Sequence, residues 1–147
     1  MTTLIKTFAY KSADYDKALH LRDRVLRQPL GLKFTPEELK KDEHDTHFGL
    51  FNGETILACL ILTETENKRM KMRQVAVDDQ YQGHGLGKEL SLAAEQYALQ
   101  KGFDVMFCHA RKSAAPFYQK LRYSIVGDEF VEVNIPHYVM EKKLEEL

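Results

Sequence analysis

Three glycines alternate with other residues in the middle of the chain, where residues 82–87 spell Gln-Gly-His-Gly-Leu-Gly. Because glycine has no Cβ, successive backbone N–H groups in such a stretch can approach an anion closely. Apolar residues follow at helical spacing, and a helix start adds unpaired N–H groups and a positive dipole end. The residue types and their spacing therefore predict a phosphate-binding turn.

Two familiar phosphate loops do not fit this spacing. A dinucleotide-binding fingerprint needs Gly-x-Gly-x-x-Gly, and Lys88 stands where its third glycine belongs. The loop of nucleoside triphosphatases needs Gly-Lys followed by Ser or Thr, whereas Glu89 follows here and Gln82 stands in place of the first glycine. Both alternatives are excluded by spacing.

The stretch resembles the acyl-CoA pyrophosphate loop of the GNAT superfamily of N-acetyltransferases, which reads Gln or Arg, two variable positions, Gly, any residue, then Gly or Ala. Residues 75–78 resemble the fourth strand of that family and its exit. Residues 114–123 are similar to a later helix of the family, with Arg122 at a turn in place of the usual glycine. Residues 22–31 and 130–140 resemble segments of a bacterial subgroup that includes the ElaA-like proteins.

This resemblance implies direct transfer of the acetyl group of acetyl-CoA to a primary amine of a small molecule or peptide, without a metal. Tyr118 would protonate the departing thiolate, and Glu132, His137 or water would be the base. The implied cofactor-binding residues are Val75, Ala76, Val77, Gln82, Gly83, His84, Gly85, Leu86, Gly87, Lys88, Ser113, Phe117 and Lys120. The alternative is a non-catalytic module that binds acyl-CoA as a sensor or scaffold, and the presence of Tyr118 favours the enzyme.

Other chemically capable residues have simpler interpretations. Cys59 and Cys108 lie in apolar runs without metal-binding spacing, which predicts buried free thiols. His44 and His47 lack a third soft ligand nearby and are expected on a surface loop. His109, at a strand end, is left open between the core and a pocket wall.

Three arginines cluster in the first predicted helix. Arg22, Arg24 and Arg27 suit the C-terminal end of a helix, where cations interact favourably with the dipole. An arginine fork also suits a substrate carboxylate or phosphate, so both interpretations stay open.

Composition limits the class of protein. A chain of 147 residues suits one domain, residues 1–147. Lys and Arg number 21 against 22 Asp and Glu, so charge gives no argument for nucleic acid or an anionic membrane. No run approaches about 18 apolar residues and the start shows no leader pattern, which predicts a cytoplasmic protein. A small amine is the expected partner, and a homodimer is left open.

Periodicity and turn residues predict the secondary structure around these groups. Ser12 or Asp14 and then Thr35 are expected to cap the first two helices, and Ser113 a later one. Asn52-Gly53 predicts a type I′ hairpin turn. Strands are predicted at 4–10, 47–50, 55–62, 71–77, 105–109, 123–126 and 138–144, with a loop over 127–136, and helices at 15–26, from 36, from 86 to about 101, and at 113–121.

A strand, a crossover helix and a following strand imply a parallel pair, whereas the hairpins are antiparallel. With the family resemblance, this predicts an α+β fold in which a mixed, mostly antiparallel sheet of six to seven strands is flanked by about four helices.

Overall fold

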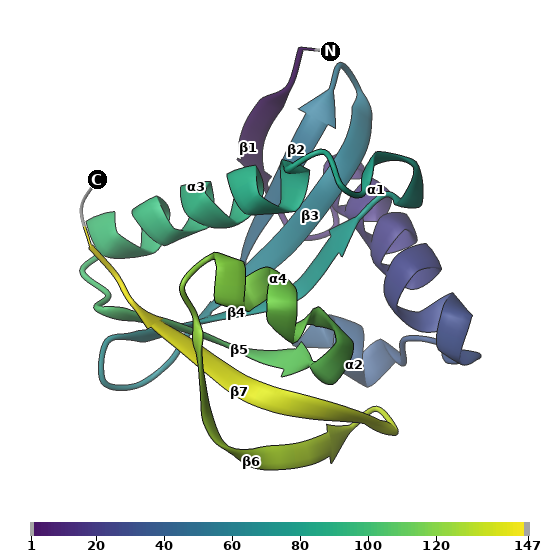
Figure 1. Ribbon diagram of the computed structural model, residues 1–147. Helices are drawn as coiled ribbons and strands as arrows, with labels where there is room; N and C mark the ends of the chain where they lie inside the picture. The colour runs from purple at the N-terminus through teal and green to yellow at the C-terminus, as the bar shows by residue number, and fades with distance from the viewer. Residues whose placement is uncertain (1, 146–147) are drawn as a thin grey trace. The chain divides into compact units, whose positions relative to one another are not determined.

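A computed structural model describes residues 2–145 of the chain (Figure 1). Over those residues it has seven strands and four α-helices, which confirms the predicted α+β fold. In chain order these are β1 Leu4–Phe8, α1 Ala13–Arg22, α2 Pro36–Lys40, β2 Thr46–Asn52, β3 Thr55–Glu64, β4 Arg69–Val77, α3 Leu86–Gln100, β5 Val105–Arg111, α4 Ala115–Lys120, β6 Ser124–Glu132 and β7 Ile135–Lys143.

The sheet is mixed, with the strand order β1-β2-β3-β4-β5-β7-β6. β4 and β5 pair in parallel because α3 carries the chain across between them, whereas β1–β2, β2–β3, β5–β7 and β6–β7 are antiparallel. The chain forms two compact units. Over the described residues, unit 1 comprises residues 2–63 and Gln74–Ala94, and unit 2 comprises Glu64–Arg73 and residues 95–145.

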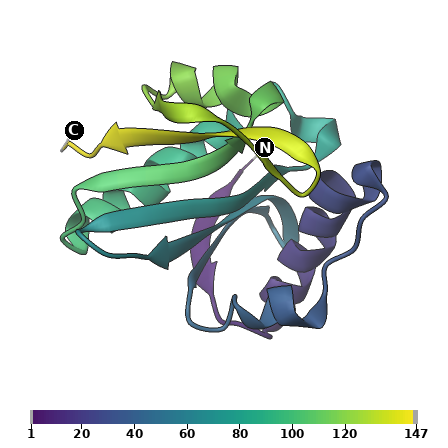
Figure 2. The ribbon, with the colours of Figure 1, turned by 90° about the horizontal axis from the view of Figure 1, so that it is seen from below.

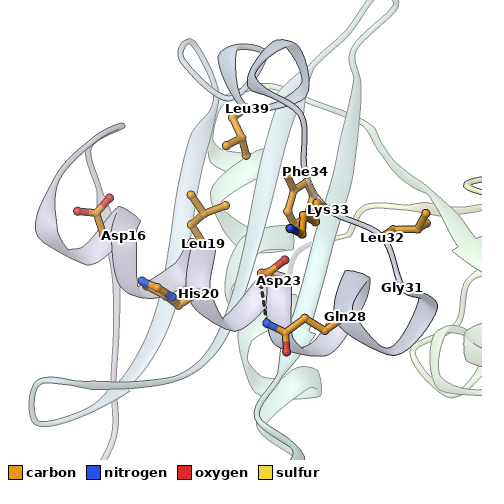
Figure 3. Close-up of a pocket in the computed structure, with 10 residues that line it drawn as sticks. All are labelled: Asp16, Leu19, His20, Asp23, Gln28, Gly31, Leu32, Lys33, Phe34 and Leu39. Atoms are coloured by element: carbon orange, nitrogen blue, oxygen red, sulfur yellow. Dashed lines mark hydrogen bonds between the residues drawn. The ribbon is translucent and has the colours of Figure 1, made fainter.

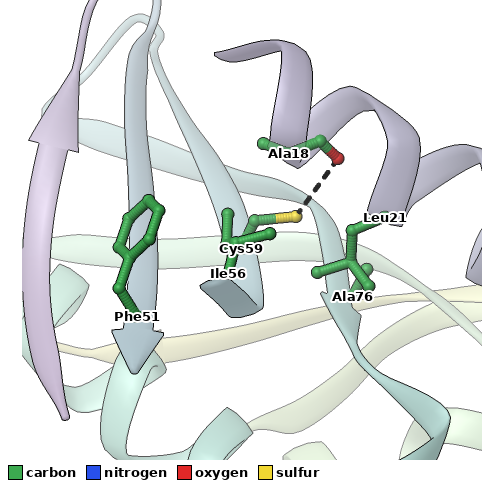
Figure 4. Close-up of a cluster of buried hydrophobic side chains, with 6 residues drawn as sticks. All are labelled: Ala18, Leu21, Phe51, Ile56, Cys59 and Ala76. Carbon is green, nitrogen blue, oxygen red and sulfur yellow. Dashed lines mark hydrogen bonds between the residues drawn. The ribbon is translucent and has the colours of Figure 1, made fainter. Parts of the chain in front are cut away.

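In unit 1, α1 starts where Ser12 caps it, since the Ser12 Oγ accepts a hydrogen bond from the Tyr15 N–H at 3.1 Å. α1 packs on the strands through Ala18 and Leu21, in a buried cluster shown in Figure 4. The cluster consists of Ala18, Leu21, Phe51, Ile56, Cys59 and Ala76. This apolar packing anchors the helix.

The predicted first helix extends to residue 26, but the α-helical part ends at Arg22. The chain continues as a π-helix over Asp23–Arg27 and a 3-10 turn over Gln28–Leu30, and then ends at Gly31 with φ 67°. Thr35 caps α2 as predicted, in a capping box with Glu38.

The hairpin between β2 and β3 differs from the prediction by one residue. Asn52 pairs with Thr55, so the turn residues are Gly53 and Glu54. A register shift between Leu50 and Phe51 moves the pairing, and Gly53, not Asn52, takes the positive φ.

In unit 2, α4 packs along one side of β5 and β7 (Figure 2). The expected cap at Ser113 is wrong, because Ser113 lies in the 3-10 turn Lys112–Ala114 and Ala114 is the N-cap without a side-chain bond. Arg122 has φ 74°, which confirms that it lies at a turn, at the position where the family usually has glycine.

The loop expected over residues 127–136 is instead a long hairpin. β6 runs to Glu132 and β7 starts at Ile135, so the turn consists of Val133 and Asn134, with φ 44° and 65°. A β-branched residue rarely adopts positive φ, so Val133 gave no turn signal in the sequence. The hairpin brings Glu132 close to His137, as described below.

Candidate functional site

The glycine-rich turn follows the end of β4 in unit 1. Gly83 and Gly85 have φ of 83° and 78°, a conformation that side-chain-bearing residues adopt only with strain. A Cβ added at either position would meet no atom within 4 Å. The backbone conformation therefore requires glycine here, and the space beside the turn is open to a ligand.

The turn leads directly into the N-terminus of the 15-residue helix α3. The Glu89 N–H donates to the Gly85 carbonyl at 3.0 Å, which starts the intrahelical ladder. The N–H groups of Leu86, Gly87 and Lys88 precede this bond, at the end of the helix where backbone donors lack intrahelical acceptors. With the exposed Lys88 side chain, these donors suit an anion such as a pyrophosphate.

The side chain of Gln82 is used within the turn. Its Nε2 donates to the Val77 carbonyl at 3.1 Å and to Asp79 Oδ1 at 3.0 Å. Gln82 thus ties the glycine turn to the end of β4. His84 is exposed, with its ring centroid 6.4 Å from that of Tyr81.

Strand β4 carries an irregularity that the sequence did not indicate. Gln74 has φ 55°, which breaks the expected alternation of Met72, Gln74 and Ala76 on one face. Met72 and Ala76 are buried, whereas the Gln74 side chain is half-buried, and its Oε1 is buried without a hydrogen-bond partner in the part of the chain described. The left-handed residue stands directly before Val75, Ala76 and Val77, the last three residues of β4.

In unit 2, Tyr118 is buried on α4, and its ring lies 5.0 Å from that of Phe117 and 5.6 Å from that of Tyr123. Burial, and secondly the neighbouring Cys108 thiol, raise the pKa of Tyr118 above its usual value. Its phenol therefore keeps its proton at neutral pH. Ser113 and Lys120, at the two ends of this segment, are exposed.

Strands β5, β6 and β7 carry a cluster of two histidines and a glutamate, formed by His109, Glu132 and His137. Neighbouring residues of a strand point to opposite faces, so His109 lies on the face opposite Cys108. Glu132 Oε1 lies 3.1 Å from His109 Nδ1, and Glu132 Oε2 lies 3.8 Å from His137 Nε2. The structure thus brings two predicted site residues together.

His109 is the member of the cluster that sequence reasoning left unassigned. The sequence signal that could have placed it was the alternation of β5, which puts His109 on the same face as Phe107, two residues earlier. Its ring packs edge-on against Phe130 at 5.2 Å between centroids. Phe130 in turn pairs with His137 across β6 and β7, so the register of the hairpin assembles the cluster.

The three arginines of the first helix are each ion-paired within unit 1. Arg22 contacts Asp42 at 2.8 Å, Arg24 contacts Asp78 at 2.7 Å, and Arg27 contacts Glu38 at 2.7 Å. Carboxylates of the chain itself thus engage these guanidiniums, which removes the support for a substrate anion at this position.

The surface position expected for His47 is wrong, because its side chain is buried in β2. The predicted free, buried thiols are confirmed at Cys59 and Cys108, and burial raises the pKa of each to about 12. Both thiols therefore stay protonated at neutral pH.

A pocket of about 590 Å³ lies in unit 1 beside the outer face of α1 (Figure 3). Its lining includes the apolar residues Leu19, Leu32 and Phe34 and the hydrogen-bonded pair Asp23 and Gln28. None of the site residues predicted from the sequence lines it.

Within residues 2–145, no group of three or more His, Cys, Asp or Glu side chains could hold a metal ion. None of the helices in that range is long and apolar enough to cross a membrane.

The family model for the acetyltransferase (GNAT) domain matches residues 26–144. The chain belongs to the GNAT acetyltransferase family. The curated Bacillus subtilis protein YyaT, which is uncharacterised, is 36% identical over 74 residues, and this match covers 50% of each chain. The GNAT chain thus spans about half the length of the curated relatives that it matches first.

Solved structures confirm the GNAT fold. A Lactobacillus plantarum protein described as an N-acetyltransferase has a TM-score of 0.89 at 25% identity, over 99% of this chain and 100% of its own. Escherichia coli ElaA has a TM-score of 0.82 at 15% identity, over 96% and 99%. An aminoglycoside 6′-N-acetyltransferase complexed with coenzyme A has a TM-score of 0.80 at 13% identity, over 98% of each chain.

Proposed function

We propose that this GNAT chain is an N-acetyltransferase that transfers the acetyl group of acetyl-CoA directly to a primary amine. The glycine turn carries this proposal. Gly83 and Gly85 hold a left-handed backbone beside open space and lead into the N-terminus of α3. These donors fit the pyrophosphate of coenzyme A, with Leu86, Gly87 and Lys88 binding it through their N–H groups. His84 would add its backbone N–H.

The end of β4 would hold the pantetheine arm. Val75, Ala76 and Val77 follow the left-handed Gln74 at the end of β4 and carry backbone N–H and C=O groups. These groups would bind the amides of the arm and polarise the thioester carbonyl. Ser113, Phe117 and Lys120 would complete the contacts from α4 and the turn before it.

Tyr118 would give its proton to the departing thiolate. Its raised pKa keeps the phenol protonated before the reaction, so a proton is available when the carbon–sulfur bond breaks. Glu132 and His137 would receive the acceptor amine on the opposite face of β5 and β7. The transfer needs no metal, because these groups supply both proton transfer and charge stabilisation.

The first test is thiol release from acetyl-CoA, measured across a panel of small amines, amino sugars and peptides. A rate above background with any member supports the transferase. Coenzyme A binding without thiol release from any member would favour the alternative, an acyl-CoA sensor.

Calorimetry with coenzyme A tests the binding site itself. Gly85→Ala should weaken binding about tenfold, because the added Cβ disturbs the donors of the turn. Gly102→Ala is the matched control, since Gly102 also has positive φ, 91°, with nothing within 4 Å of an added Cβ. Gly102→Ala should destabilise the fold similarly and leave coenzyme A affinity unchanged. Equal affinities for the two variants would contradict the assigned site.

A further inference from the structure

His137 has only one nitrogen available for proton transfer. Its Nδ1 lies 2.9 Å from the carbonyl oxygen of Ile135, and a carbonyl can only accept a hydrogen bond. Nδ1 therefore carries the hydrogen, and in the neutral ring Nε2 has the lone pair. That lone pair faces Glu132 Oε2 at 3.8 Å.

His137 Nε2 and Glu132 Oε2 are both hydrogen-bond acceptors, and a gap separates them. At 3.8 Å it is too wide for a direct hydrogen bond, and a neutral imidazole offers no proton to the carboxylate. One nitrogen with two N–H groups can reach both acceptors at ordinary hydrogen-bond distances of about 2.9 Å. A primary ammonium group has this geometry and the charge that a carboxylate prefers.

The third member of the cluster fixes the carboxylate. His109 Nδ1 lies 3.1 Å from Glu132 Oε1, and the ring of His109 is packed against Phe130. Because the carboxylate can only accept, Nδ1 of His109 is the donor of this bond. The bond leaves Oε2 directed at His137.

Exposure falls from the carboxylate toward the imidazole. The side chain of Glu132 is 44% exposed, whereas that of His137 is 4% exposed. A cationic acceptor arriving from solvent would therefore meet Glu132 before it reaches His137.

We propose that Glu132 and His137 form an ammonium-binding site in which Glu132 Oε2 holds the cation, His137 Nε2 takes its proton and His109 positions Glu132. This rests on the proposed acetyl transfer and assigns its acceptors as amines that arrive protonated. Two protons leave the nitrogen. The first passes to His137 Nε2 and then to solvent, and the second leaves as the carbon–nitrogen bond forms and restores the proton that Tyr118 gives to the thiolate.

The experiment compares two acceptors in the thiol-release assay at pH 7. One is the primary alkylamine that the wild-type chain uses best, which is protonated at this pH, and the other is aniline, which is neutral. His137→Gln should lower kcat for the alkylamine about 100-fold and lower the aniline rate at least tenfold less, because aniline needs no proton removed before attack. Equal loss with both acceptors would overturn the role of His137.

The positioning role of His109 has its own signature. His109→Leu should raise KM for the alkylamine about tenfold with little change in kcat, as should Glu132→Gln. His109→Asn keeps an N–H near the position of Nδ1 and should restore KM. Failure of the asparagine variant to differ from the leucine variant would show a packing role only.

A binding measurement separates this inference from the proposed reaction. In ¹⁵N NMR of the histidine rings, propylammonium should shift the His137 Nε2 resonance of the wild-type chain and not that of Glu132→Gln. This readout needs no turnover. If no amine releases thiol but the shift occurs, the transferase proposal fails and the ammonium site stands, whereas turnover without any shift overturns the site.

Discussion

His47 in unit 1 and His137 in unit 2 have similar partners. Each directs one ring nitrogen at a backbone carbonyl, His47 Nε2 at Asp42 and His137 Nδ1 at Ile135, at 2.8 and 2.9 Å. Each also has a carboxylate nearby, and each packs against aromatic rings. The two clusters differ in what those carboxylates do.

Asp42, the carboxylate near His47, is hydrogen-bonded to buried side chains. Asp42 Oδ2 accepts from the Tyr15 hydroxyl at 2.7 Å and from Arg22 NH1 at 2.8 Å, and all three side chains are buried. In the His137 cluster, Glu132 is 44% exposed and meets His137 across a gap too wide for a hydrogen bond. The two histidines are equally buried, with 3% of each residue exposed, so the hydrogen bonding and exposure of the neighbouring carboxylate are what set the two clusters apart.

Removing each carboxylate in turn should give the largest difference in stability between the two clusters. Asp42→Ala leaves a buried guanidinium and a buried phenol without their partner, and loss of one member of a buried ion pair costs about 3–5 kcal/mol. Glu132→Ala removes an exposed group and should cost about 0.5 kcal/mol or less. Urea unfolding measures both, and equal losses would show that the two clusters do not differ in this way.

Two buried tyrosines of unit 2 extend the contrast. The Tyr123 hydroxyl donates to Glu95 at 2.9 Å, in a network that Lys142 completes at 2.7 Å. Tyr118→Phe should lower the rate of thiol release about 100-fold with little change in stability. Tyr123→Phe should lower the free energy of unfolding by about 1–3 kcal/mol, because Glu95 loses a buried donor, and should leave the rate unchanged. If Tyr123→Phe lowered the rate and Tyr118→Phe lowered the stability, Tyr123 would be the proton donor and Tyr118 the structural residue.

The pH dependence of stability tests the buried histidine. Burial is the main cause that lowers the pKa of His47, so the folded chain keeps this ring neutral where the unfolded chain protonates it. Stability should therefore fall as pH drops from 7 through about 6.5, by at most about 1.4 kcal/mol per pH unit. His47→Gln should flatten this slope.

The window between pH 7 and pH 5 isolates this effect. The lowered pKa values of Asp14 and Glu38 arise mainly from hydrogen bonds to Lys6 and Arg27, and their stabilisation is lost only below their ordinary values of 3.8 and 4.5. An unchanged slope in His47→Gln between pH 7 and pH 5 would mean that another group titrates there.

The smallest expected effect concerns the turn beside the open cluster. Val133 has φ 44°, which strains a β-branched side chain. Val133→Asn should relieve this strain and raise the free energy of unfolding by about 1 kcal/mol. Val131→Asn, on the exposed side of β6, is the control and should give no gain. Thermal unfolding measures both, and equal effects would show that turn strain is not the cause.

Local sequence determined the parts of the molecule that depend on short-range chemistry. Ser12 and Thr35 cap helices because a side-chain oxygen reaches an N–H three residues ahead. Gly83 and Gly85 mark left-handed backbone before a helix start, because no other residue adopts it as readily. The glycine-rich turn and the family motif could therefore be recognised without a structure.

Tertiary structure alone decided which polar groups meet. Glu132, His137 and His109 come together only because the β6–β7 hairpin closes at Val133 and Asn134 and pairs with β5 in one register. That register depends on contacts between residues distant in sequence, and a shift of one residue would turn each side chain to the other face. The same reason explains why His47 could not be assigned to the core from its polar neighbours, since the strand pairing that buries it lies outside its own segment.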